Sequence, residues 1–277
     1  MERIQAAIQK AKEKRSDAAG VAFAPSPSRP AGRATAQDEA VRAAWDQIPS
    51  FSPDPVRMRR ERVVSFERSD PSHLTFDMLR TKVLQQMNEK GWTSLAITSP
   101  SSGCGKTMVS LNLAFSLAQQ RDSRTVLMDL DLRRPALAKA LGLRDMNHSI
   151  EELLQGDGEL DRHFVRYEEG LAISGNAMPA RNPAELLHHP STGQALEGLK
   201  AMLRPQVMLY DTPPMLTCDD MMALVPNVDC VLLVAGAGVS TIDEIDRCER
   251  DLDEQTNVLG VVLNKCRYSN EDYNYYS

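Results

Sequence analysis

One segment constrains the fold of this chain more than any other, because it joins a short apolar run to a helical pattern through a glycine-rich turn. The run is Leu95-Ala-Ile-Thr98, the turn is Ser99-Pro-Ser-Ser-Gly-Cys-Gly105, and Lys106-Thr107 begin the helical stretch. The strict phosphate-binding loop reads G-x-x-x-x-G-K-[S/T], and Pro100 stands here where the first glycine is usual. The two glycines of the turn still allow backbone N–H groups to face inward around an anion. The segment therefore predicts a strand, loop and helix that bind a nucleotide.

The chemistry expected of this loop is the binding of ATP with Mg²⁺. Lys106 would reach the β- and γ-phosphates, and the Thr107 hydroxyl would bind the metal ion. The start of the following helix adds a dipole that favours negative charge. A glycine-rich turn with only a structural purpose would not need Gly-Lys-Thr at the start of a helix. The loop residues expected to contact the nucleotide are Ser102, Gly103, Cys104, Gly105, Lys106, Thr107 and Met108.

Carboxylates end two other apolar runs. Val126-Leu-Met128 leads into Asp129 and Asp131, and Val207-Met-Leu-Tyr210 leads into Asp211. In extended geometry Asp129 and Asp131 face the same way, toward the crevice where ligands bind in open α/β sheets. Beside a Mg-nucleotide, one of this pair would hold the metal shell and the other would accept a proton from an attacking hydroxyl. The sequence does not divide these two roles between them.

Charged residues nearby complete the expected site. Arg133 follows the first carboxylate pair and is expected to contact the nucleotide. Asp219 and Asp220 could touch the loop after Asp211, although helix capping is the preferred interpretation for one of them. The expected catalytic residues are Lys106, Asp129 and Asp131, and the expected metal-binding residues are Thr107, Asp129 and Asp211.

Short, β-branched apolar runs alternate with helical stretches along residues 70–265. Such runs are typical of central strands of a parallel sheet that is buried on both faces. The alternation predicts an α/β fold, a doubly wound, mostly parallel sheet with helices on both faces. A helix is also expected from Ser72 to Lys90, closed by Gly91. The expected strands contain residues 95–98, 126–128, 171–173, 207–210, 231–234 and 258–263, and the expected helices include 106–120, 192–203 and 241–254.

Charge divides the chain into two parts. Residues 1–68 carry 13 Lys+Arg and 9 Asp+Glu, a balance of +4, whereas the remainder carries 19 and 29, a balance of −10. In this basic arm, residues 1–15 could form a short helix, and residues 16–60 are expected to be disordered. Residues 57–64 are interpreted as a solvated linker, with an edge strand or a contact to an anionic surface as alternatives. The expected organisation is a basic arm (1–68), a P-loop domain (69–265) and a flexible tail (266–277).

Composition argues against several classes of protein. The net charge of −6 does not suit a uniformly basic nucleic-acid binder, and no nucleic acid is expected as a partner. No apolar run approaches the ~20 residues of a membrane-spanning helix, and the start of the chain lacks the apolar core of a signal peptide. Five scattered cysteines without a Cys-x-x-Cys pair argue against a disulfide framework or a zinc site. A reducing cytoplasm is therefore the expected compartment.

Tyrosine is concentrated at the end of the chain, because four of its six tyrosines lie in the last ten residues. The segment around them is polar and acidic, which suits a tail that enters the crevice of a neighbouring subunit. A tyrosyl hydroxyl has a pKa of about 10, so a positioned carboxylate base would assist its attack. The four tyrosines are Tyr268, Tyr273, Tyr275 and Tyr276.

With these residues in place, the chain resembles the bacterial tyrosine kinases of the capsular and exopolysaccharide family, which are P-loop enzymes of the deviant Walker A type. The resemblance covers about residues 70–277. Its most specific element is the Walker A′ motif, because a Walker A motif alone is widespread. The matching segments are Ser99–Thr107 (Walker A), Asp129–Pro135 (Walker A′), Asp211-Thr-Pro-Pro214 (Walker B), Asn182–Leu187 and Val258–Lys265.

The resemblance implies ATP-dependent autophosphorylation of the four tail tyrosines, in trans between neighbouring subunits. It also implies control by a membrane adaptor of the polysaccharide copolymerase type, which governs polysaccharide chain length and export. A position at the inner face of the cell membrane through this partner follows, together with reversal by a phosphotyrosine phosphatase.

Departures from the family pattern also bear on function. The related MinD/ParA-like ATPases carry an extra lysine early in the loop, where this chain has Ser101, and this difference favours the kinase interpretation. In the family's first helix a Glu and two Arg hold a ring of subunits. Here Leu74 and Asp77 replace the Glu and the first Arg, and only Arg80 remains, so self-association by this ring contact is not supported. Cys104 replaces a common Glu; a phosphate nest could lower its thiol pKa and make it oxidisable, and a small loop filler is the simpler interpretation.

Two alternatives to an autokinase remain open from the sequence. The first is a regulatory P-loop ATPase of the MinD/ParA-like class, which switches conformation with nucleotide and phosphorylates no tyrosine. The second is a non-enzymatic scaffold that binds nucleotide only for stability.

Overall fold

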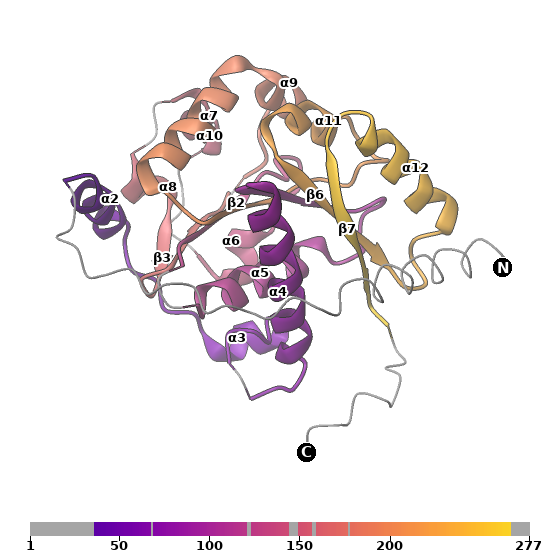
Figure 1. The fold of residues 1–277 in the computed structure, drawn as a ribbon, viewed down its shortest axis with the longest axis horizontal. Helices are drawn as coiled ribbons and strands as arrows, with labels where there is room; N and C mark the ends of the chain where they lie inside the picture. The colour runs from indigo at the N-terminus through magenta and orange to yellow at the C-terminus, as the bar shows by residue number, and fades with distance from the viewer. Residues whose placement is uncertain are drawn as a thin grey trace. The chain divides into compact units, whose positions relative to one another are not determined.

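The computed structural model describes residues 36–67, 69–120, 123–143, 149–156, 159–176 and 178–266. The expected helix at residues 1–15 and the four tail tyrosines lie outside these residues. From Gln37 onward the described residues belong to one compact unit, which is built around a seven-stranded sheet. Figure 1 shows this sheet in the middle of the unit with helices on either side.

The sheet is mostly parallel, as the sequence predicts. Its strand order is β3-β4-β2-β5-β1-β6-β7, and every neighbouring pair is parallel except β3 and β4. All six expected strands are present, but the short edge strand β3 is not predicted because its three residues contain no apolar run. The strands are β1 (Ser94–Thr98), β2 (Thr125–Asp129), β3 (Val165–Tyr167), β4 (Leu171–Ser174), β5 (Val207–Asp211), β6 (Cys230–Gly236) and β7 (Asn257–Asn264).

Helices cover both faces of the sheet, which confirms the doubly wound α/β architecture. One face packs against α3 to α6, and the other packs against α2 and α7 to α12. The helices are α2 (Ala36–Gln47), α3 (Pro55–Arg60), α4 (His73–Lys90), α5 (Lys106–Ala118), α6 (Leu137–Leu141), α7 (Ile150–Gln155), α8 (Leu160–His163), α9 (Pro183–His188), α10 (Pro190–Leu203), α11 (Asp220–Leu224) and α12 (Ile242–Asp253), with a 3-10 turn η1 (Val225–Asn227).

Alternate side chains of the central strands enter two separate apolar clusters. In β1, Leu95 and Ile97 join the cluster beneath α4 and α5, whereas Ala96 joins the cluster on the opposite face. Every residue of β1, β2, β5 and β6 is buried. A parallel sheet covered on both faces requires such continuous apolar runs, which explains why they are visible in the sequence.

The expected disorder of residues 16–60 is wrong for the part that the structure describes, because α2 and α3 are packed on the domain. The indole Nε1 of Trp45 donates a hydrogen bond of 2.8 Å to the carbonyl of Leu203. The Arg124 guanidinium lies 5.3 Å from the centroid of the same ring. Val41, Ala44, Trp45 and Ile48 recur at helical spacing and are all buried, a pattern that the Ala-, Pro- and Arg-rich composition of the segment obscures.

Residues 61–67, called the strap below, run along α5 after α3 ends. Asn112 is fully buried in α5, and its side-chain oxygen accepts hydrogen bonds from the N–H groups of Val64 (2.8 Å) and Ser65 (2.9 Å). Its amide nitrogen donates to the carbonyl of Arg62 (2.9 Å). Residues 57–64 are therefore neither a solvated linker nor an edge strand, because they form the end of α3 and the first part of the strap, whose backbone α5 holds.

The helix expected to carry the ring contact, α4, ends at Gly91 in a left-handed conformation (φ 72°), as its sequence predicts. On this helix Arg80 Nη1 donates to Asp77 Oδ1 (2.8 Å) and to the carbonyl of Ser116 in α5 (2.8 Å). These residues at the ring positions thus contact each other and α5 within one subunit.

Two absences concern the part of the chain described above. No helix there is both long enough and apolar enough to cross a membrane. The five cysteines, all of them among the described residues, are unpaired.

Candidate active site

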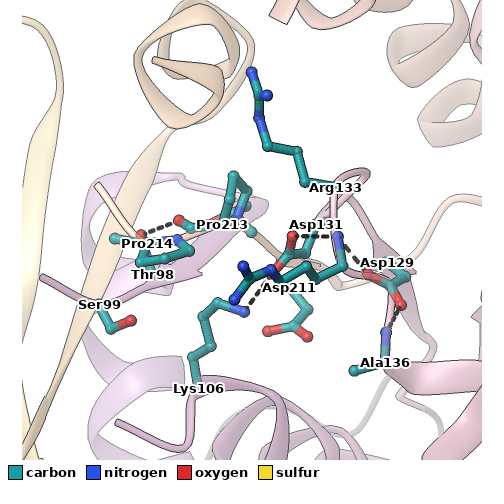
Figure 2. A network of polar contacts seen from close by, with 12 residues as sticks. Thr98, Ser99, Lys106, Asp129, Asp131, Arg133, Ala136, Asp211, Pro213 and Pro214 are labelled. Atoms are coloured by element: carbon teal, nitrogen blue, oxygen red, sulfur yellow. Dashed lines mark hydrogen bonds and ion pairs between the residues drawn. The ribbon is translucent and has the colours of Figure 1, made fainter. Parts of the chain in front are cut away.

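The expected site residues gather where β1, β2 and β5 end. These strands are adjacent in the sheet, and the register places Asp129 of β2 beside Asp211 of β5, which in turn pairs with Ile97 of β1. Figure 2 shows Lys106, from the start of α5, pointing toward the carboxylates of Asp131 and Asp211. One lysine and three carboxylates therefore meet at the carboxyl edge of the sheet, the position at which open α/β folds bind ligands.

The glycine-rich loop owes its shape to two left-handed glycines and to a contact from β7. Gly103 has φ 84° and Gly105 has φ 93°, a region that residues with a Cβ rarely adopt. Asn264 at the end of β7 donates from its side chain to the carbonyl of Cys104 (2.8 Å). A Cβ on Gly105 would lie 2.3 Å from this same amide nitrogen, so a side chain there would displace Asn264 from the loop. The loop is therefore pre-shaped as an anion cradle, with Ser102 and Gly103 exposed at its rim.

Lys106 already has a carboxylate partner. Its Nζ lies 2.6 Å from Asp131 Oδ2, and both side chains are largely buried. Burial opposes the charge of Lys106, but Asp211 and Asp131 outweigh burial and raise the pKa of the ammonium above its usual value. The lysine is therefore a permanent cation in the cradle, available to the negative charge of a phosphate.

Asp129 is held by backbone rather than by a cation. Its Oδ2 accepts from the N–H groups of Ala136 (2.8 Å) and Leu137 (2.9 Å), and its Oδ1 accepts from the N–H of Asp131 (3.2 Å). Burial and the nearby Asp211 raise the pKa of Asp129 to about 8, although the N–H donors oppose this shift. Asp129 thus organises the loop after β2, and its carboxyl group binds a proton more readily than that of a free aspartate.

Asp211 is a fully buried carboxylate with an unused oxygen. Its Oδ1 accepts from Ser110 Oγ (3.0 Å), whereas its Oδ2 has no hydrogen-bond partner among the described residues. Burial raises the pKa of Asp211, against the opposing influence of Lys106 and the hydroxyls of Thr107 and Ser110. An orphaned buried carboxylate oxygen is rare in proteins and indicates a missing partner such as a cation or its bound water.

The donor set fits Mg²⁺, a hard cation that prefers oxygen ligands. The expected metal-binding residues Thr107, Asp129 and Asp211 lie together at this edge and present only oxygens. Within the described residues, however, no three His, Cys, Asp or Glu side chains converge closely enough to hold a metal by themselves. This arrangement matches the usual protein site for Mg²⁺, in which phosphates of the substrate and waters supply the other ligands.

The loop after β5 is locked onto the glycine-rich loop. Thr98 Oγ1 donates to the carbonyl of Pro213 (2.7 Å), and Thr212 Oγ1 donates to the carbonyl of Ile97 (2.9 Å). The N–H of Met215 also donates to the carbonyl of Ser99 (2.9 Å). Three hydrogen bonds therefore hold the loop after β5 against the end of β1 and the start of the glycine-rich loop.

Arg133 is paired with a carboxylate of the segment that follows β5. Figure 2 shows its side chain pointing away from Lys106, and its guanidinium instead forms two hydrogen bonds, of 2.7 and 2.8 Å, with Asp220. Asp220 begins α11 and is fully buried, so an ion pair rather than a helix cap explains it. In this structure Arg133 is therefore engaged by Asp220, and its contact with the nucleotide stays a prediction.

Cys104 contributes its backbone to the cradle, while its side chain faces the interior. The thiol is buried and contacts Ser240 Oγ (3.2 Å) and the carbonyl of Ser101 (3.2 Å). Burial alone would raise the pKa of the thiol, but the hydrogen bonds with Ser240 and Ser101 hold it below its usual value. The pKa of the Cys104 thiol is thus lowered, which is the predicted direction. The cause is its contacts with a hydroxyl and a carbonyl rather than a phosphate nest.

A cavity of about 960 Å³ adjoins the cradle. Its walls include the strap, the start of α4, and Met108, Asn264 and Lys265. Met108 follows directly on Thr107, so the cavity opens beside the phosphate position.

Three residues of the site were not assigned from the sequence: Ser110, which bonds Asp211; Asn264, which shapes the loop; and Asp220, which holds Arg133. Each lies far along the chain from its partner or within an apolar helix, so no local pattern marks it. Asn264 lies in Val258–Lys265, a segment that matches the family pattern, but this match did not indicate the contact of Asn264 with the glycine-rich loop.

Comparison with known proteins agrees with this geometry. The family model of the CobQ/CobB/MinD/ParA nucleotide-binding domain matches residues 95–277. The putative tyrosine-protein kinase EpsB of Ralstonia nicotianae is 31% identical over 208 residues, which are 74% of this chain and 27% of EpsB. The tyrosine-protein kinase etk of Escherichia coli is 33% identical over 190 residues, which are 67% of this chain and 25% of etk. The chain thus spans about a quarter of the length of these curated relatives.

Solved structures give the same result for the domain. The VpsO kinase domain matches with a TM-score of 0.62 and 32% identity over 70% of this chain and 96% of that domain. The kinase domain of Escherichia coli ETK matches with a TM-score of 0.66 and 27% identity over 76% of this chain and 83% of that chain. A MinD from Pyrococcus horikoshii, solved with Mg-ADP, shares the fold at 22% identity and a TM-score of 0.52, over 64% of this chain and 72% of that one. The chain therefore belongs to the CobQ/CobB/MinD/ParA nucleotide-binding domain family, and it is similar over most of its length to the kinase domains of bacterial tyrosine kinases.

Proposed function

We propose that this protein is an ATP-dependent protein-tyrosine kinase that phosphorylates its own tail tyrosines in trans and thereby regulates the chain length and export of a capsular polysaccharide or exopolysaccharide. The observation that carries the proposal is the buried cluster of Lys106, Asp129, Asp131 and Asp211 at the mouth of a pre-shaped anion cradle. The similarity to kinase domains that match most of this chain supports the same activity.

The phosphates of ATP would lie in the cradle made by the backbone of residues 102–107, with Lys106 as their cation. Lys106 would then exchange part of its contact with Asp131 for the phosphates, because both are negative partners of one ammonium. The nucleoside would extend past Met108 into the adjoining cavity, whose volume of about 960 Å³ is at the upper end of the range of small-molecule sites.

Thr107, Asp129 and Asp211 would hold Mg²⁺, and Asp211 Oδ2 is the ligand oxygen that has no partner within the described part of the chain. When bound, the ion supplies neutralisation of the charge on the phosphates. The chain's own part is to keep these carboxylates dry and aligned, which Ser110 does for Asp211 and the N–H groups of Ala136 and Leu137 do for Asp129.

A tyrosyl hydroxyl has to lose its proton as it attacks. Asp129 and Asp131 are the carboxylates placed to accept this proton, and a raised pKa such as that of Asp129 brings the acceptor closer to neutral pH, where general bases are most effective. We propose that the acceptors of phosphate are Tyr268, Tyr273, Tyr275 and Tyr276, which follow the end of β7 within twelve residues.

Each phosphate would add a charge of about −1.5 to −2 to an already acidic tail. That change would drive the tail out of a neighbour's site and weaken self-association, and a phosphotyrosine phosphatase would reset it. The proposed partner is a membrane adaptor of the polysaccharide copolymerase type, which would hold the protein at the inner face of the cell membrane.

Incubation of the purified protein with MgATP, with and without such an adaptor, followed by detection of phosphotyrosine, tests the proposal. Labelling of the unaltered protein and its loss in Lys106→Met and in a variant with all four tail tyrosines changed to Phe is the expected result. Hydrolysis of ATP with no phosphotyrosine in either condition would instead support a regulatory ATPase. Labelling of Lys106→Met would show that the active site is misassigned.

A further inference from the structure

Arg133 and Asp220 form a pair whose two members differ greatly in exposure. The guanidinium Nε and Nη2 donate to both carboxylate oxygens of Asp220, at 2.7 and 2.8 Å. The side chain of Asp220 is 0% exposed, whereas that of Arg133 is 47% exposed, and the adjacent Asp219 is 81% exposed and 3.8 Å from Nη2. This geometry is the two-bond fork that makes arginine–carboxylate pairs specific as well as strong.

Asp220 depends on this arginine. No other hydrogen-bond or ion-pair partner of its carboxylate is found among the described residues, and a buried carboxylate without a cation is strongly unfavourable. If Arg133 left Asp220 to bind a phosphate, the buried carboxylate of Asp220 would lose its cation, which is strongly unfavourable. The exposed side of Arg133 is open to solvent, but its donors are already aimed at Asp220.

The pair joins the two loops that carry the carboxylates of the site. Arg133 lies two residues after Asp131, in the loop after β2, and Asp220 begins the helix after the loop that Asp211 starts. Between the two loops the N–H of Leu130 donates to the carbonyl of Asp211 (2.8 Å). The two segments are thus joined twice: next to the sheet by the Leu130–Asp211 backbone hydrogen bond, and farther from the sheet by the Arg133–Asp220 pair.

We propose that Asp220 is a positioning residue of the kinase site: through Arg133 it fixes the loop of residues 130–136 so that Asp131 faces Lys106 and Asp129 keeps its backbone donors. Because it concerns the reaction, this inference rests on the proposed function. It assigns Arg133 to a brace between two loops rather than to the nucleotide.

Hydrogen exchange of the metal-free and nucleotide-free protein provides the first test, because it does not depend on activity. The amides of Asp131, Arg134, Ala136 and Leu137 are all bonded to carboxylates within the loop. In Asp220→Asn these amides are expected to exchange about tenfold faster, because the charge-assisted hydrogen bonds that connect the loop to α11 are weakened. Asp219→Asn is the matched control, since it alters an adjacent but exposed carboxylate, and it should change exchange less than twofold.

A double-mutant cycle separates a brace from a ligand. If the two residues act as one unit, Arg133→Gln and Asp220→Asn should raise the Mg²⁺ concentration for half-maximal ATP turnover by a similar factor of about ten, and the double variant should be no worse. Arg133→Lys keeps the charge beside Asp220 without the fork, so it serves if Arg133→Gln does not fold, and an intermediate effect is expected.

Two results would overturn the inference. One is unchanged loop exchange in Asp220→Asn; the other is an Arg133→Gln variant that loses ATP affinity while Asp220→Asn does not. Absence of phosphotyrosine in the unaltered protein counts against the proposed function instead, and the exchange comparison then still decides whether Asp220 holds the loop.

Discussion

Replacing Asn112 by Leu should detach the strap from α5, and the structure allows the cost to be worked out. Asn112 is fully buried and serves the strap with three hydrogen bonds, to the N–H groups of Val64 and Ser65 and to the carbonyl of Arg62. A fourth bond, to the carbonyl of Met108 (2.9 Å), concerns α5 itself. Leu has similar bulk but can make none of these bonds.

The three strap groups would lose their hydrogen-bond partner, and those that stay covered would be left unsatisfied. A net contribution of roughly 1 kcal/mol per hydrogen bond gives about 3 kcal/mol, and the penalty for groups left unsatisfied works in the same direction. For a domain of this size, 1 kcal/mol corresponds to a shift in Tm of about 2–4 °C, so a decrease of about 6–12 °C is expected. Because the strap forms a wall of the cavity beside Met108, ATP affinity should fall as well.

Urea unfolding followed by circular dichroism, together with a fluorescent ATP analogue, measures both effects. The control is Asn88→Leu, the same change at an exposed position on α4, for which a change within about 0.5 kcal/mol is expected. A loss of less than 1 kcal/mol in Asn112→Leu, with unaltered ATP affinity, would refute the conclusion that the strap is an integral part of the domain.

Three further predictions follow from the site. In metal-free protein the pKa of Asp129 in the folded state, about 8, lies above its value in the unfolded state. Its contribution to stability is therefore lost as pH rises through 8. The Tm, measured from pH 5 to 9, should fall with pH more steeply than in Asp129→Asn. Gly105→Ala should lower ATP affinity more than tenfold in an equilibrium binding assay, because it combines a φ of 93° with a contact of 2.3 Å to Asn264, and Asn264→Ala should relieve only the contact. In native protein a thiol reagent should label exposed Cys266 before buried Cys104, as peptide mass analysis would show; equal rates would contradict the burial of Cys104.

Much of the fold could be read from local pattern, for a physical reason. The central strands are buried on both faces, so each is a continuous apolar run, and the glycine-rich loop between Thr98 and Lys106 has a chemistry that few other structures need. The carboxylates Asp129 and Asp211 follow such runs directly. Their meeting at one sheet edge follows from parallel pairing of neighbouring strands.

The described part of the arm before residue 68 could not be predicted from its composition. Trp45 and the strap are separated from the core by Pro-, Ser- and Arg-rich sequence, and a disordered segment has the same composition. What holds them is not in their own sequence: the carbonyl of Leu203 receives the indole, and the buried Asn112 receives the strap backbone. A polar residue within an apolar helix is a weak signal until its partner is known.

The residue pattern alone predicts a parallel α/β sheet with a phosphate-binding loop and carboxylates at its carboxyl edge, because strand burial and loop chemistry are local properties. The partner of each charge is visible only in the folded chain. There Lys106 pairs with Asp131, one oxygen of Asp211 has no partner among the described residues, and Arg133 pairs with Asp220. These choices depend on distances between segments far apart in the chain, and the energy of a buried charge depends on those distances far more than on its neighbours in sequence.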